Sequence, residues 1–392
     1  MNAAPTPADS TSPSAYPEPD IAYAIGWEHA RRGCVPPAEQ LQPDNPVRLG
    51  WEAGRARFGR RTLPADHHVR QWLRLRLGAW QQGLGFEPLQ LNPALLRHIE
   101  PRCCPVTGAA LTHGSGGPDD ATVTRINAGA GWALGNLAVI SARAHRAKAA
   151  HGPQAALDFA RRIEDGGPAA IAGLDAAQWQ RLAVLTAFAT PLPHGRAATL
   201  PLLVLPPPRL QVLNPAQALQ VMLSLQFTRA GHARRCTALA ARLPSADARH
   251  AFHAFLHTLL ARRLAAGRCA DTDGERARVE RLWLDPLVNR RWQRLVLQLD
   301  AAACEQLVAF AVERGLAGAA LRWRPQQAAT EGWALGARAP AAPEAGRAPA
   351  GEAAASIPAA VSPALRTAQA RYASRPACQP QPALPAPLAA QG

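Results

Sequence analysis

Helical signals dominate the chain between residues 20 and 336, so the sequence predicts a mainly α-helical protein. Near the N-terminus, "IAYAIGWEHARRG" follows Asp20 as its cap and stops at Gly33. "PVRLGWEAGRARFG" follows Asn45 as its cap, starts with a proline and stops at Gly59. We expect two short helices joined by a proline-bearing loop over residues 20–61.

Further helices are predicted on both sides of residue 150. In "VRQWLRLRLGAW" (69–80) the tryptophans and leucines suit one helical face better than an alternating strand, and "LNPALLRHI" (91–99) begins with an asparagine cap and a proline. The apolar, proline-rich segment 200–213 predicts an extended strap across the helices of the second half. Three helices of that half follow a capping residue, at Asp175, Asn214 and Asp300.

One helix of the second half carries three histidines on a single face. Within 245–264, His250, His253 and His257 fall at i, i+3 and i+7, opposite a stripe of Phe and Leu. Three histidines can bind a metal, but a face opposite the apolar stripe is more typical of solvent exposure, which we favour. The arginine-rich run around Trp292 predicts either an RNA contact or simple packing.

One stretch departs from the helical pattern. "TVTRI" (122–126) is β-branched and alternating and predicts a strand, and the glycine-rich "NAGAGWALGN" turns the chain back. "LAVI" (137–140) predicts the returning strand, after which Ser141 caps a short helix, "ARAHRAK" (142–148). The predicted order is therefore strand, strand, helix.

This order and these residues resemble the HNH, or ββα-metal, endonuclease family over 103–148. Asn136 and the following leucine match the Asn-Leu pair that opens the family's second strand. His145 falls at the family's metal-ligand position on the helix, and Lys148 at its closing lysine. The resemblance implies that His145 binds a divalent metal such as Mg²⁺ and that Asn136 acts at the catalytic centre.

The first strand departs from the family. Thr124 and Arg125 stand where the family has its metal-binding Asp and its general-base His. Arginine does not lose a proton near neutral pH, and threonine is a poorer ligand for a hard metal than a carboxylate. Asp119 or Asp120 could supply the carboxylate, with His113 as a displaced base; alternatively, the two aspartates only form a turn before the strand.

A structural zinc is not expected in this ββα finger (103–148). A closed zinc site needs four good ligands, and one thiolate cannot build it, although Cys103 and His113 could contribute. We expect packing to hold the finger, with Cys104 as a small buried residue. The positions that carry four cysteines in many family members read Cys104, Thr107, Ser141 and Ala144.

Three functions fit these residues. In the one we favour, the ββα finger is a nucleic-acid-binding module without catalysis, whose phosphate contacts come from the basic residues listed below. In the second it is a working metal-dependent endonuclease with His145, Asn136 and His113 at the catalytic centre and His145 and Asp120 at the metal. In the third the finger is only a folded core element. The basic residues of the first hypothesis are Arg125, Arg143, Arg146 and Lys148.

The helical hairpin of 20–61 resembles the ribosome modulation factor family. Each helix carries a Gly-Trp pair, Gly26-Trp27 and Gly50-Trp51, in which glycine permits close helix approach and the indole supplies buried area. The resemblance implies a ribosome or RNA contact. The alternative is a self-contained hairpin that docks on the next domain.

Composition allows nucleic-acid binding without proving it. The chain of 392 residues is 48% hydrophobic, enough for more than one core, and carries a formal charge of +15 with a pI near 11.0. Nearly all the basic residues are arginines, which is typical of a high-GC genome, and Lys148 is the only lysine. DNA or RNA is the partner we expect, with the ribosome as a possibility and the oligomeric state open.

The sequence gives no sign of export or of a membrane. Seven scattered cysteines, an odd number, are typical of a reduced compartment rather than a disulfide framework. The N-terminus lacks the basic start and apolar run of a signal peptide, and the apolar segment 200–208 is too short and too rich in proline to span a bilayer. We therefore expect a cytoplasmic protein.

Composition also suggests the domain organisation. Residues 1–19 and 337–392 are rich in Pro and Ala and predict a flexible N-terminus and a disordered tail, because they cannot bury enough apolar surface to offset their ordering entropy. Between them we expect three parts. These are the hairpin (20–61), the ββα finger with its preceding helices (62–150) and a helical domain (151–336).

Overall fold

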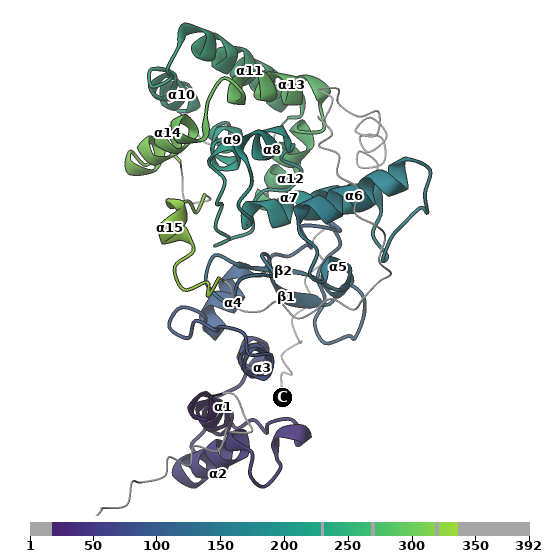
Figure 1. Ribbon diagram of the computed structural model, residues 1–392, viewed down its shortest axis with the longest axis vertical. Coiled ribbons are helices and arrows are strands. Elements are labelled where there is room, and N and C mark those ends of the chain that lie inside the picture. The colour runs from purple at the N-terminus through teal and green to yellow at the C-terminus, as the bar shows by residue number, and fades with distance from the viewer. Residues whose placement is uncertain (1–17, 229–230, 268–270, 318–320, 336–392) are drawn as a thin grey trace, which may run out of the picture. The chain divides into compact units, whose positions relative to one another are not determined.

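The computed structural model confirms a mainly helical protein and divides the chain into two compact units (Figure 1). The first unit holds residues 18–98 with 131–133 and 333–335, and the second holds the other described residues. The ββα finger therefore belongs with the helical half, and the helices before it belong with the hairpin, unlike the predicted boundaries near 62 and 150. The structure describes residues 18–228, 231–267, 271–317 and 321–335.

The predicted N-terminal and C-terminal segments fall largely outside the described residues. The flexible N-terminus was expected over 1–19, of which only 18 and 19 are described. The disordered tail was expected over 337–392, and none of it is described.

The first unit contains the helical hairpin and the two helices that follow it. Asn45 caps α2 by accepting a hydrogen bond from the Val47 amide, as predicted, and Asp66 caps α3 through Val69. The first helix begins one residue before Asp20, because a proline occupies its first turn. The elements are α1 (Pro19–Arg31), η1 (Ala38–Gln40), α2 (Pro46–Phe58), α3 (His67–Gln81) and α4 (Pro93–Ile99).

Glycines allow α1 and α2 to approach closely, as the two Gly-Trp pairs predict. A Cβ added to Gly26 would lie 1.9 Å from the Val47 carbonyl oxygen, and one added to Gly50 would lie 2.0 Å from that of Tyr23. The tryptophans differ from the prediction, since Trp27 and Trp51 are only half-buried. Both indoles therefore leave part of their ring surface accessible.

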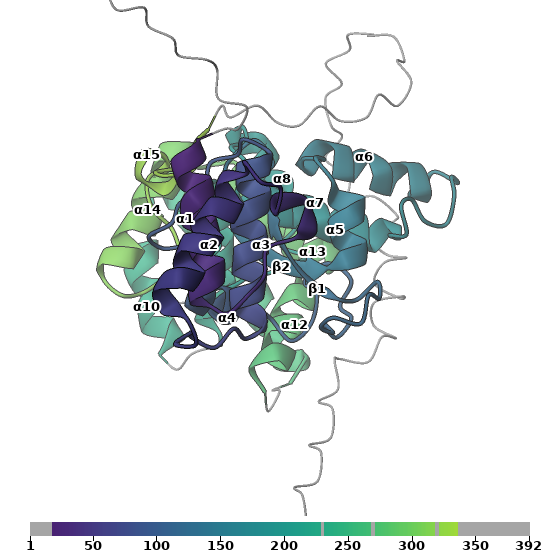
Figure 2. The same ribbon diagram turned by 90° about the horizontal axis from the view of Figure 1, so that it is seen from below.

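The second unit combines the ββα finger with a helical layer (Figure 1). In both views α5 and α6 lie at the end of this unit away from α10 and α14 (Figure 2). The finger elements are β1 (Ala121–Arg125), β2 (Leu137–Ser141) and α5 (Ala142–Lys148). The helices are α6 (Pro153–Glu164), α7 (Ala176–Phe188), α8 (His194–Thr199), α9 (Pro215–Gln226), α10 (His232–Ala240), α11 (Ala246–Ala265), α12 (Thr272–Leu282), α13 (Pro286–Val296), α14 (Ala301–Glu313) and α15 (Gln326–Ala329).

The core of the helical layer forms around the predicted strap and three tryptophans. Most of segment 200–213 is buried without regular secondary structure. Trp179, Trp283 and Trp292 are each at most 1% exposed, and the rings of Trp283 and Trp292 meet edge to face. Trp292 therefore packs inside the protein, which settles the choice between packing and RNA contact for this side chain.

The membrane and cysteine predictions have different outcomes. Among the described helices, none alone is long and apolar enough to cross a bilayer; α13 and α14 pass that test only as a pair, bent by 102°. Four described cysteines are free thiols, but Cys103 is in a disulfide, which departs from the reduced set that the sequence predicts. The free cysteines are Cys34, Cys104, Cys236 and Cys304.

Candidate functional site

The ββα finger has the predicted order, and local signals explain it. β1 and β2 are antiparallel, with Ala121 opposite Ser141 and Arg125 opposite Leu137. Ser141 ends β2 and caps α5 by accepting a hydrogen bond from the Ala144 amide at 3.3 Å. The strand, strand and helix predicted over 122–148 are all present.

Asn136 closes the turn between the strands from inside the protein. It is fully buried, its Oδ1 accepts from the Asn127 amide at 2.8 Å, and its Nδ2 donates to the Asn127 carbonyl at 3.0 Å. The side chain thus replaces a pair of backbone hydrogen bonds across the loop. Asn136 therefore holds the turn between the strands, and its place at a catalytic centre stays a prediction.

Thr124 and Arg125 are committed to internal structure. Thr124 is 3% exposed and its hydroxyl donates to the Arg125 carbonyl. The Arg125 guanidinium donates from one Nη1 to the carbonyls of Ala128 and Ala130, at 2.9 and 2.6 Å, and burial lowers its pKa. These two residues brace the turn, so the predicted phosphate contact by Arg125 competes with its backbone hydrogen bonds.

Both loop aspartates are engaged within their own loop or with α5. Asp120 accepts from Thr112 Oγ1, from Ser115 Oγ and from the Gly116 amide, at 2.6, 2.6 and 2.7 Å. The Ser115 and Thr112 hydroxyls lead the causes that lower its pKa to about 2. Asp119 forms an ion pair with Arg143 at 3.1 Å. The Asp120 hydrogen bonds fit the turn interpretation, whereas Asp119 pairs with a residue of α5.

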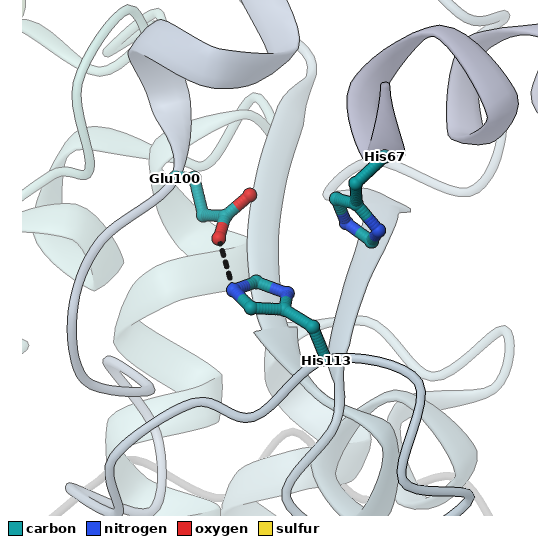
Figure 3. A group of neighbouring side chains, drawn as sticks. All are labelled: His67, Glu100 and His113. Carbon is teal, nitrogen blue, oxygen red and sulfur yellow. Dashed lines mark ion pairs between the residues drawn. The ribbon is translucent and has the colours of Figure 1, made fainter. Parts of the chain in front are cut away.

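His113, the predicted displaced base, pairs with Glu100. Its Nε2 lies 2.9 Å from a Glu100 carboxylate oxygen, and the two side chains face each other (Figure 3). The imidazole is exposed and the carboxylate half-buried. His67, also drawn in Figure 3, is the first residue of α3 and belongs to the first unit.

His145 and Lys148 lie one turn apart on α5, toward the interior of the finger. Lys148 is 2% exposed, and its ammonium makes one long hydrogen bond, 3.5 Å to the Ala149 carbonyl. Burial, and then the nearby Arg125, lower its pKa to about 8. His145 is half-buried, its Nδ1 has no hydrogen-bond partner, and burial followed by the charge of Lys148 lowers its pKa.

The surroundings of these side chains bear on the predicted metal and phosphate sites. In the part of the chain that the structure describes, His145 belongs to no group of three His, Cys, Asp or Glu side chains close enough to share an ion, and neither does Asp120. Lys148 does not present its charge to solvent. Of the four predicted phosphate contacts, Arg146 is exposed and Arg143 is about one-third exposed and paired with Asp119.

Cys104, which the resemblance places at a zinc-ligand position, is buried inside the ββα finger. Cys104 is 1% exposed, and its sulfur accepts hydrogen bonds from the Thr107 and Ser141 amides at 3.4 and 3.2 Å. The prediction that Cys104 is a small buried residue is confirmed.

The three histidines of α11 are exposed, as predicted for a solvated face, and their positions are His250, His253 and His257.

A second candidate site, which the sequence reasoning missed, lies in the first unit. Residues 55–76 contain seven arginines and one acid, Asp66, and we call them the arginine segment. It runs from the end of α2 to the middle of α3 and contains no lysine. The signal was present as a local charge run, but the arginine-rich composition of the whole chain concealed it. Six of the seven arginines are exposed, namely Arg55, Arg57, Arg60, Arg61, Arg70 and Arg74.

The exposed arginines of this segment are free of acidic partners. Across the described residues, none of the six forms an ion pair, and the one acid, Asp66, is taken up by Arg97 and by the cap of α3. Arg55 lies over the half-buried Trp51 ring, 4.7 Å from its centroid. Phe58, within the arginine segment, packs against Trp27 with ring centroids 5.1 Å apart, and both rings are half-buried.

No family model, curated protein or solved structure matches this chain.

Proposed function

We propose that this protein binds nucleic acid without cleaving it, through the arginine segment of its first unit. The observation that carries the proposal is the set of six exposed arginines in residues 55–74 that have no acidic partner among the described residues. Unpaired surface cations concentrate positive potential, which attracts the phosphate backbones of nucleic acids.

Arginine and aromatic rings together favour a nucleic acid over a simple anion. A guanidinium stacks on bases as well as binding phosphate, and aromatic rings provide platforms for unstacked bases. Arg55 over Trp51, and Trp27 beside Phe58, offer both kinds of contact. A single-stranded ligand is therefore expected to bind more tightly than a duplex of the same length.

The ββα finger contributes less to the proposed binding than the arginine segment does. Its resemblance to the HNH family remains a prediction, and the exposed Arg146 is its one freely accessible basic side chain among those predicted. A nuclease of this type needs a metal ligand and a base on the first strand, and Thr124 and Arg125 are poor substitutes. Binding without cleavage fits these residues best.

The binding proposal is tested by fluorescence anisotropy with labelled single- and double-stranded DNA and RNA. Two neutralised variants, Arg60→Gln/Arg61→Gln and Arg70→Gln/Arg74→Gln, should each weaken binding about tenfold or more at low salt. The matched control is Arg31→Gln/Arg48→Gln, which removes the same charge from arginines that already pair with Glu28 and Glu52. Equal losses for control and test variants would contradict the proposal.

The absence of cleavage is tested separately on plasmid DNA and structured RNA. The protein is incubated with Mg²⁺, Mn²⁺ or Zn²⁺, and the substrates are expected to stay intact. Metal-dependent cutting that disappears in His145→Ala would instead establish the endonuclease.

A further inference from the structure

Helix α11 carries two neighbouring histidine side chains on its exposed face. His253 and His257 are both exposed, and their ring centroids lie 6.1 Å apart with 37° between the ring planes. Side chains at i and i+4 of a helix are neighbours, and two histidines at this spacing can bind one zinc ion. Since such an ion lies about 2.0–2.1 Å from each nitrogen, small side-chain rotations bring both rings to it.

Both imidazoles are free to bind an ion. Among the described residues, neither ring forms an ion pair or a hydrogen bond; His253 and His257 contact each other, and His253 also contacts the neighbouring Phe252. A neutral imidazole offers one nitrogen lone pair to a metal. No existing hydrogen bond has to break, so binding costs little beyond the rotamer freedom of two side chains.

The surface around the two rings is open. Ala254 and Ala261, three residues before and four residues after His257 in the sequence, have side chains too short to cover an imidazole. One charged side chain stands at the same helical spacing, Arg249, four residues before His253, and its guanidinium donates to a backbone carbonyl before the helix. Water therefore has access to an ion that both rings bind.

His250, the third histidine of this face, belongs to a different part of the surface. It lines a groove between α11 and α13 together with Asp247 and Arg294. Within the described part of the chain, the ring of His250 makes no ring contact with His253. The geometry therefore favours a pair of ligands over a group of three.

We propose that His253 and His257 form a two-ligand site for a divalent transition-metal ion such as Zn²⁺, with water in the remaining positions. Imidazole nitrogen suits Zn²⁺, Cu²⁺ and Ni²⁺, whereas Mg²⁺ and Ca²⁺ prefer oxygen ligands. Two imidazoles occupy half of the four positions of a tetrahedral zinc ion. The solvent exposure that the sequence predicts for this face is what makes both rings accessible.

The test follows the ring signals of ¹³C-labelled histidine by NMR as Zn²⁺ is added to the full chain without nucleic acid. The chain has 12 histidines, so the ring signals of α11 are assigned by their loss in the single variants described below. We expect the signals of His253 and His257 to shift together along one saturation curve. Mg²⁺, about ten times as concentrated, should shift neither signal, because it prefers oxygen ligands.

Three single variants distinguish a shared ion from separate histidines. His253→Gln should weaken Zn²⁺ binding at His257 about tenfold or more, and His257→Gln should do the same at His253, because each ring holds the ion at a high effective concentration for the other. His250→Gln is the matched control, since it removes an exposed histidine from the same helix face. It should leave the saturation curve of the pair unchanged.

Several results would overturn the proposal. Unshifted ring signals, or different saturation curves for His253 and His257, would show that the two rings do not share an ion. Unchanged affinity at His257 in His253→Gln would show the same. An equal loss of affinity in His250→Gln would contradict the assignment to this pair. Because nucleic acid is absent from the experiment, each of these results leaves the proposed function of the arginine segment untouched.

Discussion

Arg181 of α7 and Glu280 of α12 form a buried ion pair across 99 residues of sequence, with 2.9 Å between Nη2 and Oε2. Both side chains are less than 10% exposed. The same guanidinium donates to the carbonyls of Pro105 and Leu203, each at 2.8 Å. One side chain therefore ties the start of the finger, the buried strap and two helices together, which explains why the finger and the helical layer form one unit.

Breaking this ion pair should strongly destabilise the second unit. Arg181→Met leaves Glu280 buried without its partner and is expected to cost about 3–5 kcal/mol in the free energy of unfolding. Arg181→Met/Glu280→Met removes both charges and should lose less than the sum of the two single variants by about 1 kcal/mol or more. Urea denaturation followed by tryptophan fluorescence measures all three, and strictly additive losses would contradict the coupling.

Lys148 should make stability rise with pH in a narrow alkaline window. Burial and Arg125 lower its pKa from 10.5 to about 8 in the folded protein, so the proton favours the unfolded chain. The free-energy cost of burying the charged Lys148 ammonium is complete below pH 8 and disappears as the pH approaches 10.5. In phosphate-free buffer, Lys148→Met should therefore be more stable than the wild type by about 3 kcal/mol at pH 7.5 and similar to it near pH 10.5.

Urea denaturation at several pH values between 7 and 10.5 measures this difference. Arg146→Gln, an exposed position on the same helix, serves as the control and should follow the wild-type profile. Parallel profiles for the wild type and Lys148→Met would show that the lysine titrates normally.

The helix crossing in the first unit should tolerate no side chain at Gly26. A Cβ there would lie 1.9 Å from the Val47 carbonyl oxygen, so Gly26→Ala must separate α1 from α2 and should cost about 3 kcal/mol. Gly78 of α3 is the matched control, because an added Cβ meets nothing within 4 Å. Gly78→Ala should stabilise by about 0.5–1 kcal/mol, and hydrogen exchange of the helix amides measures both changes.

The loop before β1 should depend on the Asp120 carboxylate. Asp120→Ala removes the acceptor of the Ser115 and Gly116 amides, so these amides should exchange with solvent about tenfold faster. Hydroxyl and amide donors lower the pKa of Asp120 to about 2, from 3.8, so its contribution is present above pH 4 and is lost as the pH falls toward 2. Unchanged exchange in the variant, compared by NMR at pH 6, would contradict this role.

The sequence predicts the finger and hairpin well because their signals are local. Ser141 and Asn45 sit at helix starts as capping residues, and Gly59 ends α2 with a positive φ of 54°. The antiparallel strands follow from a β-branched run, a glycine-rich turn and a second apolar run. Each of these signals acts within a few residues, so tertiary structure adds little to them.

The surroundings of the functional residues predicted in the ββα finger were harder to predict, because they depend on contacts between residues that are distant in the sequence. Nothing in "ARAHRAK" indicates that Lys148 is buried, since lysine is usually exposed and its environment here comes from packing of α5 on β1 and β2. The same holds for Arg125, whose guanidinium is bound to turn carbonyls. The Asp120 hydrogen bonds likewise require the loop to fold back on itself.

The central claim, nucleic-acid binding through the arginine segment, is tested most directly by the salt dependence of binding. The logarithm of the binding constant for single-stranded RNA or DNA is measured against the logarithm of the salt concentration. The variant Arg60→Gln/Arg61→Gln/Arg70→Gln/Arg74→Gln should reduce the slope by about 3, since each lost phosphate contact removes about 0.7. Arg31→Gln/Arg48→Gln should leave the slope unchanged. A slope that is the same in the wild type and the quadruple variant would contradict the claim.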